Sequence, residues 1–258
     1  MSEQDNNYQR RRRQFRGMLT VYGRKSTLEA LSDTDLPCHA LHLAESNRDS
    51  GIIRDILSLA TQRGIPVQRH TREALSRISR NGRQDQGVAA DVVCPAFQEL
   101  DDYLAGNGNG RRLLALDGIT NPQNAGMIIR SAVAAGVDGI IYPDRGTAAL
   151  GPLMIKASVG TVFRAPLLRC ERLLPALEAS RAAGFSVFFL DGNAQASLFD
   201  PRPETDLIYV MGGESDGVSA GVQALADGGL AIPMSNNVES LNVAVSAALV
   251  AYAGYLRD

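Results

Sequence analysis

The chain has 258 residues, of which 45% are hydrophobic and 21% charged, and its formal net charge is −2. These values are ordinary for one large or two small globular domains, and the net charge argues against a protein that coats nucleic acid over its whole surface. No apolar run approaches the roughly 20 residues that a membrane helix needs, and the polar N-terminus lacks the apolar core of a signal peptide.

Cysteine and histidine are both scarce, with three of each in the chain. The cysteines are far apart, in neither a disulfide framework nor a zinc-binding spacing. We therefore expect no metal site, no membrane segment and a reducing, cytoplasmic location.

The N-terminus carries a block of positive charge within residues 9–17, which read QRRRRQFRG. Like charges repel, so we expect residues 1–17 to form a disordered basic arm. Arginine forks pair with phosphates, which favours a nucleic-acid contact over a solvated tail or a cloning remnant. The candidate residues are Arg10, Arg11, Arg12, Arg13 and Arg16.

Residues 18–95 have the pattern of a small α/β unit, in which apolar residues at helical spacing alternate with short β-rich runs. The predicted helices are Gly23–Leu31, Ile52–Gln62 and Thr71–Ile78, with Thr71 as a cap, and the predicted strands include Cys38–Leu43 and Val88–Val93.

Residues 96–111 contain the run AGNGNG, which suits a linker. A second domain is predicted over 112–258, where short apolar strands alternate with helices. This alternation predicts a parallel sheet covered by helices. The expected strands are 112–116, 139–142, 186–190, 207–211 and 230–232, and the expected helices are 126–135, 171–183, 219–226 and 240–255.

Three polar loops follow strands of the second domain, at residues 116–132, 210–219 and 232–242. Ligands of open parallel sheets bind beyond the carboxyl ends of the strands, so these loops are the candidate site. The second loop is rich in glycine, which lets backbone approach a ligand closely. It lacks the Gly-Lys-Ser/Thr of a Walker loop, and no G-x-G-x-x-G follows the first strand, so neither nucleotide fold is indicated.

Taken singly, the polar residues of these loops have ordinary explanations. Arg130 fits a surface arginine, although a groove-facing arginine needs a phosphate or carboxylate partner. Glu214 fits either a turn or a ligand contact. Ser240 and Asn236 are good helix caps, which predicts a last helix from Ser240 to Tyr255.

Together the loops resemble the signature motifs of the SpoU branch of the SPOUT methyltransferases. The match in order and spacing covers roughly residues 112–256. Two positions depart from these motifs. The pair Asn236-Asn237 stands where glycine or another small residue is common, and Ala244 stands where serine is frequent. The matching patterns are Pro122-x-Asn124-x-Gly126-x-x-x-Arg130, Gly212-x-Glu214-x-x-Gly217, Ile232-Pro233-Met234 with Ser240-Leu241-Asn242, and Lys156-Ala157-Ser158-Val159-Gly160.

The first domain resembles the substrate-binding domain of the same family, which is similar to small RNA-binding ribosomal proteins. Such a domain is typical of the subgroup that methylates a guanosine in 23S-type rRNA. The resemblance adds Arg24 to the expected RNA-binding residues. It rests on Val21-Tyr22-Gly23-Arg24, Glu29-Ala30-Leu31 and Gln86-Gly87-Val88-Ala89-Ala90.

The resemblance implies an enzyme that transfers a methyl from S-adenosylmethionine to a ribose 2′-hydroxyl of RNA. It implies a C-terminal domain with a parallel sheet and a deep trefoil knot, and a homodimer with its active site near the subunit interface. The alanines of the last helix (Ala244, Ala247, Ala248 and Ala251) fit close packing at that interface, or a plain core helix.

The resemblance also implies roles for single residues. Arg130 is the expected central catalytic group, oriented by Asn124 and supported by Glu214. Ser240 is expected to contact the RNA or the reacting group, and Asn242 to fix the loops. The expected cofactor-binding residues are Gly212, Ile232, Met234 and Leu241.

Three alternatives stay open at this point. The same chemistry on tRNA is one, and a non-catalytic RNA-binding or assembly protein that kept the fold is another. The third is an unrelated nucleotide enzyme with an open α/β sheet.

Overall fold

A computed structural model describes residues 16–106, 108–200 and 205–253. The chain forms two compact units that divide between Ala96 and Phe97. Of the predicted arm, Arg10 to Arg13 lie outside the described residues. Within the described ranges, no helix is long and apolar enough to cross a membrane.

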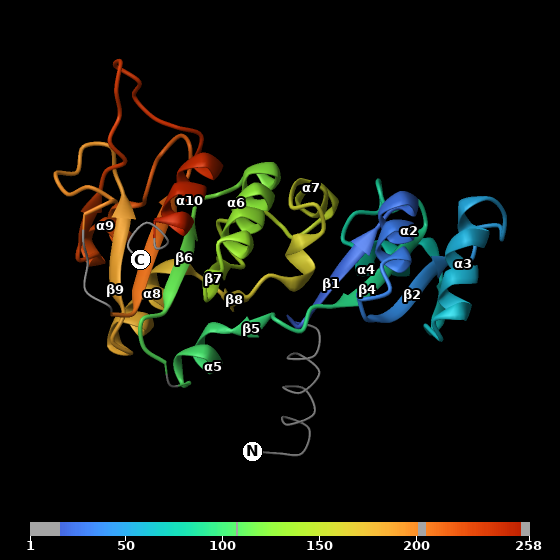
Figure 1. Cartoon of the computed structure of the whole chain (residues 1–258). Helices are drawn as coiled ribbons and strands as arrows, with labels where there is room; N and C mark the ends of the chain where they lie inside the picture. The colour runs from blue at the N-terminus through green and yellow to red at the C-terminus, as the bar shows by residue number, and fades with distance from the viewer. Residues whose placement is uncertain (1–15, 107, 201–204, 254–258) are drawn as a thin grey trace. The chain divides into compact units, whose positions relative to one another are not determined.

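The N-terminal unit is a four-stranded sheet in the order β1-β4-β2-β3, with helices on both faces (Figure 1). Strand β4 is antiparallel to β1 and β2, whereas β3 is parallel to β2. Helices α2 and α3 pack their apolar residues against one face, and Leu75 of α4 packs against Ala89 on the other. The elements are β1 (Met18–Tyr22), α2 (Arg24–Ser32), β2 (Cys38–Ala44), α3 (Ile52–Gln62), β3 (Val67–His70), α4 (Arg72–Ser79) and β4 (Val88–Val93).

Local sequence explains two of these helices. Helix α3 has the predicted bounds, and its buried residues Ile53, Ile56 and Ala60 recur at helical spacing. The predicted cap of α4 is confirmed, because the Thr71 side chain accepts a hydrogen bond from the Ala74 N–H.

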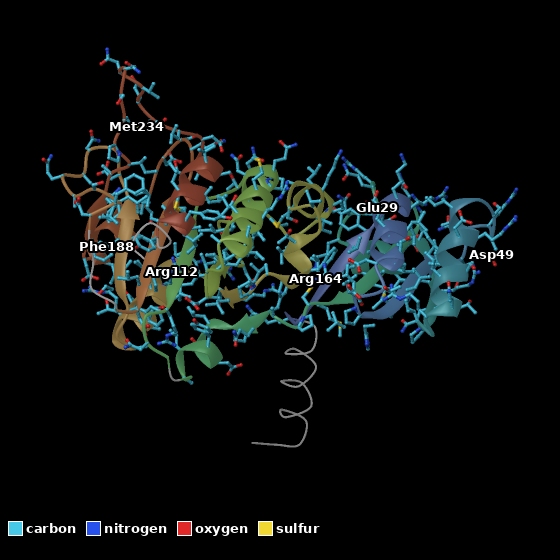
Figure 2. All side chains as sticks on the ribbon, in the orientation of Figure 1. Glu29, Asp49, Arg112, Arg164, Phe188 and Met234 are labelled. Carbon is cyan, nitrogen blue, oxygen red and sulfur yellow. The ribbon has the colours of Figure 1, made fainter. Side chains whose placement is uncertain are left out.

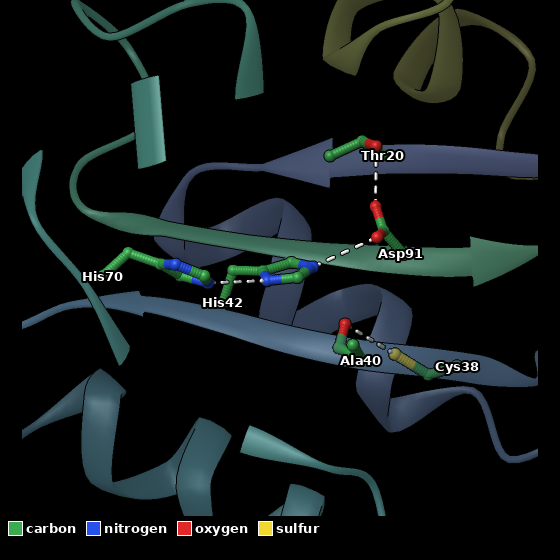
Figure 3. Close-up of polar contacts among 6 residues, drawn as sticks. All are labelled: Thr20, Cys38, Ala40, His42, His70 and Asp91. Carbon is green, nitrogen blue, oxygen red and sulfur yellow. Dashed lines mark hydrogen bonds and ion pairs between the residues drawn. The ribbon is translucent and has the colours of Figure 1, made fainter. Parts of the chain in front are cut away.

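A chain of polar side chains lies on the sheet face that α4 covers (Figure 3). Thr20 Oγ1 donates to Asp91 Oδ1 at 2.7 Å, and His42 lies 3.1 Å from Asp91 Oδ2 and 3.0 Å from His70 Nε2. Burial alone would raise the pKa of Asp91, but the hydrogen bonds from His42 and Thr20 outweigh it and lower that pKa. Burial, and then the neighbouring His42, lower the pKa of His70.

The C-terminal unit contains a seven-stranded sheet in the order β11-β9-β10-β6-β7-β8-β5, in which every pairing is parallel. The predicted parallel α/β architecture is thus confirmed. The strands are β5 (Gln98–Glu99), β6 (Arg112–Asp117), β7 (Gly139–Pro143), β8 (Leu167–Cys170), β9 (Ser186–Leu190), β10 (Leu207–Gly212) and β11 (Gly228–Leu230). The helices are α5 (Leu100–Leu104), α6 (Pro122–Ala134), α7 (Pro152–Ala157), the 3-10 turn η1 (Thr161–Arg164), α8 (Leu173–Ala182), α9 (Ala220–Leu225) and α10 (Val243–Tyr252).

Alternate residues of the central strands face opposite sides of this sheet. Leu113 and Ala115 of β6 pack with apolar residues of α8 and α9 on one side. Leu114 faces the other side, beside Val250 of α10. Helices α6 and α10 pack against each other there (Figure 1). This packing buries Ala244, Ala247 and Ala251 within the chain, so a core role accounts for these small residues.

Several elements differ from the sequence-based expectation. Part of the predicted linker is structured, because β5 pairs with β8 and Leu100 of α5 is buried. Strand β11 ends at Leu230, where the prediction begins it. The last helix begins at Val243, and its cap is Asn242, so the predicted start at Ser240 is wrong. The trefoil knot stays a prediction.

Candidate active site

Three residues from the three predicted motif loops meet through hydrogen bonds. Asn124 lies in the first turn of α6, Glu214 follows β10, and Asn242 precedes α10. Asn124 Nδ2 donates to Glu214 Oε1 at 2.7 Å, and Asn242 Nδ2 donates to the same oxygen at 3.0 Å. Asn242 Nδ2 also lies 3.4 Å from Asn124 Oδ1. Glu214 and Asn242 are 90 and 118 positions away from Asn124 in the chain, so only the fold brings the three residues together.

The chemistry of this cluster is that of a structural clamp. A carboxylate that accepts from neutral amides forms charge-assisted bonds, which are stronger than bonds between neutral groups. Asn124 is 5% exposed, so its amide depends on these partners. The Asn242 side-chain oxygen also accepts from the Ala244 N–H at 2.9 Å, which caps α10. One residue therefore starts the last helix and joins it to the other two loops.

The first loop is set by the beginning of α6. Asn121 caps this helix by accepting from the Gln123 N–H, and Pro122 occupies the first turn. Gly126 lies where α6 approaches α7, since a Cβ there would be 2.7 Å from the Met154 carbonyl oxygen. A larger residue at Gly126 would push the two segments apart and displace Asn124.

The glycine loop after β10 is held just as closely. A Cβ on Gly212 would be 2.2 Å from the Gly217 carbonyl carbon, so the loop folds back on itself. Gly213 and Gly217 exchange backbone hydrogen bonds of 3.0 and 3.1 Å. Asp117, which sequence reasoning missed, accepts from the Ser219 N–H at 2.7 Å and links the loop to the end of β6. Asp117 could have been identified from its position, because it directly follows residues 112–116, the first predicted strand of the second domain.

The third loop projects from the unit beyond Met234 (Figure 2). Its tip is a turn in which Asn236 and Asn237 have φ of 58° and 56°, closed by a bond from the Val238 N–H to the Ser235 oxygen. Asn tolerates the left-handed region better than other non-glycine residues, which explains this pair where the family favours small residues.

The third loop itself carries apolar side chains and backbone groups without hydrogen-bond partners. Leu241 is 37% exposed, and Ile232 and Met234 are half-buried. Among the described residues, the backbone N–H and C=O groups of Ile232 and Met234 form no hydrogen bond. The loop therefore offers an apolar surface next to polar backbone, which suits a ligand with a flat heterocycle.

Arg130 and Ser240 are exposed and lie outside the hydrogen-bonded cluster. Arg130 is on α6, about 9 Å further along the helix axis than Asn124. Neither side chain has a hydrogen bond or ion pair within the described part of the chain. Asn124 therefore makes no contact with Arg130 that would orient it, contrary to the expectation from the sequence. The exposed side chains of Arg130 and Ser240 are open to a substrate.

The other predicted site residues are elsewhere. Arg24 lies in the first turn of α2, in the N-terminal unit, and donates to Asn47 Oδ1 at 3.2 Å. Arg16 is the first described residue. Across the described ranges, no group of three or more His, Cys, Asp or Glu side chains has a metal-binding arrangement.

Comparison with known protein families gives two matches along the chain. The SpoU rRNA Methylase family matches residues 111–252, and the family described as RNA 2'-O ribose methyltransferase substrate binding matches residues 20–97. The chain is 32% identical over 238 residues to the putative TrmH family tRNA/rRNA methyltransferase YacO of Bacillus subtilis, and the match covers 91% of this chain and 94% of that protein.

Solved structures have the same architecture. The SpoU methyltransferase AviRb from Streptomyces viridochromogenes, in complex with AdoMet, matches with a TM-score of 0.65 and 23% identity, over 100% of this chain and 98% of that one. An RNA methyltransferase of the TrmH family from Porphyromonas gingivalis, described as putative, has a TM-score of 0.63 and 26% identity, over 98% and 93% of the two chains.

The chain therefore belongs to the SpoU rRNA Methylase family. This membership confirms the resemblance drawn from the three motif loops, and with it the predicted class: an RNA methyltransferase that uses S-adenosylmethionine.

Proposed function

We propose that this protein transfers a methyl group from S-adenosylmethionine to a ribose 2′-hydroxyl of RNA, on a guanosine in large-subunit rRNA. The observation that carries this proposal is the Asn124–Glu214–Asn242 cluster, which holds three motif loops together at the carboxyl edge of the sheet. The preference for rRNA rests on the substrate-binding unit at residues 20–97.

The residues present fit a bound S-adenosylmethionine. Ile232, Met234 and Leu241 supply apolar surface, and free backbone groups beside them can pair with the edge of an adenine. Gly212 packs so closely against the backbone of Gly217 that no side chain fits there, and this fixes the course of the glycine loop. When bound, the cofactor supplies an electrophilic methyl group.

The chain's own task is then positioning. Transfer needs the hydroxyl oxygen and the methyl carbon in line at about 3–3.5 Å. Arg130 is exposed on α6 and has no protein partner in the described chain, so its guanidinium is free to hold an RNA phosphate and to stabilise the developing alkoxide. A guanidinium stays protonated in proteins and is a poor general base, so proton loss from the hydroxyl is coupled to the methyl transfer. Ser240 lies beside Leu241 and contacts the RNA.

A homodimer with a knotted C-terminal unit completes the proposal. Exposed apolar residues support a second copy of the chain on the outer face of α10, because Val245 is 49% and Tyr252 43% exposed there. A partner on this face would lie next to the loop that precedes α10, and so next to the candidate site.

Substitutions at Arg130 and Leu241 separate catalysis from cofactor binding. We expect Arg130→Ala to abolish methyl transfer to RNA while the dissociation constant for S-adenosylmethionine stays within about twofold of wild type, because Arg130 acts on the RNA. Leu241→Ala should raise that constant by about tenfold through lost apolar contact. Labelled-methyl transfer to rRNA and tRNA transcripts, with calorimetry for cofactor binding, measures both.

Arg54→Ala is the matched control, since Arg54 is an exposed arginine on α3 of the other unit. Full activity of Arg130→Ala would refute its role, and unchanged cofactor binding by Leu241→Ala would refute the contact. Transfer to tRNA alone would keep the reaction and overturn the choice of rRNA.

A further inference from the structure

The motif segment at residues 156–160 belongs neither to the hydrogen-bonded cluster nor to the cofactor loops, and it ends helix α7. The Gly160 N–H donates to the Ile155 oxygen at 2.9 Å, and the Val159 N–H donates to the Lys156 oxygen at 3.1 Å. These two bonds form the Schellman pattern, in which the residue after the helix cap has a left-handed backbone and is usually glycine. Here that residue is Val159.

The backbone of Val159 is strained. Its φ is 52°, and among the described non-glycine residues with positive φ it is the one with a β-branched side chain. Such a side chain clashes with the backbone in the left-handed region, whereas glycine fits there freely. Val159 is also 69% exposed, so packing within the chain does not offset the strain. Strain of this kind is typical of functional positions.

Two further apolar side chains are exposed near Val159. Helices α6 and α7 touch (Figure 1), since a Cβ on Gly126 would be 3.0 Å from the Ser158 nitrogen. Met127, which follows Gly126, is 40% exposed, and Leu153 in the first turn of α7 is 58% exposed. Exposed apolar side chains therefore flank the contact between the two helices. They are called the apolar patch, which consists of Met127, Leu153 and Val159.

The exposed face of α6 joins this patch to the candidate active site. Met127 and Arg130 are three positions apart on the helix, which places their Cβ atoms about 5–6 Å apart. Asn124 and Gly126 are two positions apart and so face roughly opposite sides of α6. Asn124 faces Asn242, and Gly126 faces α7. A ligand that Arg130 holds therefore lies next to the apolar patch.

The elements around the patch are basic. Helices α6 and α7 and the turn η1, which packs against α6, contain no Asp or Glu. They carry three exposed cations, Arg130, Lys156 and Arg164. An apolar surface among cations suits a ligand that has both a flat apolar face and a negative charge. An unstacked nucleotide has both, in its base and its phosphate.

We propose that the apolar patch holds the base of the target nucleotide out of the RNA stack, while Arg130 holds the phosphate. The identity of the ligand as RNA rests on the proposed function. Apolar side chains such as Met and Leu can insert between stacked bases, and enzymes that modify a base take it out of the stack. The same displacement frees the ribose hydroxyl for in-line attack on the methyl group.

Replacement of Val159 separates this role from a structural one. Val159→Gly should melt at the wild-type temperature or above it, because glycine suits the left-handed position. Its kcat for methyl transfer to a large-subunit rRNA transcript should fall about tenfold through lost contact with the base. The dissociation constants for S-adenosylmethionine and for the transcript should stay within about twofold of wild type. Val159→Ile, which keeps a β-branched apolar side chain, should recover most of the lost rate.

Leu153→Ala should lower kcat in the same way, and Leu174→Ala is its matched control, since Leu174 is an exposed leucine on α8. Methyl NMR of the full-length chain adds a measurement that does not need the reaction. Guanosine 5′-monophosphate should shift the methyl signals of the apolar patch through the ring current of its base. Ribose 5-phosphate, which has no base, should leave them in place, and neither compound should shift the signals of Leu174.

The possible results keep the patch and the proposed reaction apart. A Val159→Gly variant with wild-type kcat overturns the patch alone, and so do patch signals that do not respond to guanosine 5′-monophosphate in a chain that methylates RNA. Patch signals that shift with protein concentration instead would show that a second copy of the chain covers the patch, which also overturns it. Selective shifts in a chain that transfers no methyl to any RNA support the patch and refute the proposed reaction.

Discussion

At the scale of single residues, Glu214 is the point on which the candidate site depends. One of its carboxylate oxygens accepts from both Asn124 and Asn242, which come from opposite ends of the C-terminal unit's sequence. The motif spacing indicated which residues belong to the site. It did not indicate that Glu214 joins them, because that bond forms only once β10 and the two helices are packed.

Removal of this carboxylate should loosen both the fold and the cofactor site. We expect Glu214→Ala to lower the free energy of unfolding by about 1–3 kcal/mol, because the buried Asn124 amide loses its acceptor. The dissociation constant for S-adenosylmethionine should rise as well, since the loops that carry Gly212 and Leu241 lose their common anchor. Denaturant titration and calorimetry measure the two effects.

Glu178→Ala provides the control, because Glu178 is an exposed carboxylate on α8. Its loss should leave both quantities near wild type. A Glu214→Ala variant as stable as the control would contradict the clamp role.

At the scale of elements, local patterns identified most helices and strands because each carries its own apolar period. Helix α3 and strand β9 have the predicted bounds. The errors arise where distant contacts decide. Ser240 and Asn242 are both good caps, and the contact with Glu214 selects Asn242. Likewise, β5 is a strand because β8 pairs with it, which no property of residues 98 and 99 reveals.

The hydrogen-bonded side chains of Thr20, Asp91, His42 and His70 make the stability of the N-terminal sheet sensitive to acid. The folded state lowers the pKa of His70 below its ordinary value of 6.5, so folding favours the neutral imidazole. The contribution of neutral His70 to the free energy of unfolding is therefore fully present above pH 6.5 and declines as the pH falls below that value. The lowered pKa of Asp91 acts in the same direction, but only below the ordinary aspartate value of 3.8.

We therefore expect weaker protection of β2, β3 and β4 amides at pH 5.5 than at pH 7.5 in hydrogen exchange, after correction for intrinsic rates. His70→Gln should remove most of this difference, because Gln does not titrate and can still donate to His42. Equal pH dependence in wild type and His70→Gln would show that His70 is not its source.

At the scale of the whole molecule, the sequence predicted a methyltransferase unit and a separate RNA-binding unit, and both family matches agree with that plan. The parallel sheet was predictable because its buried strands read as short apolar runs between helices. The knot and the second subunit are not local properties. They enter from the family resemblance, and the subunit proposal gains support from the exposed residues on α10.

Dimerisation can be tested on that surface. Val245→Glu should raise the dimer dissociation constant by about tenfold or more, because a charge would be buried against the partner. Analytical ultracentrifugation across a concentration series measures it. Leu174→Glu on α8 is the matched control, since Leu174 is 37% exposed on the other side of the sheet. A monomeric wild type, or a Val245→Glu dimer as tight as the control, would contradict the proposed interface.

A map of ribose methylation in rRNA and tRNA, from cells with and without this protein, tests the proposed reaction and its substrate together. We predict the loss of one 2′-O-methyl mark, on a guanosine of large-subunit rRNA, and its return with the wild-type chain but not with Arg130→Ala. Loss of a tRNA mark instead would overturn the substrate. If every ribose mark in both RNAs is retained, the proposed reaction is contradicted.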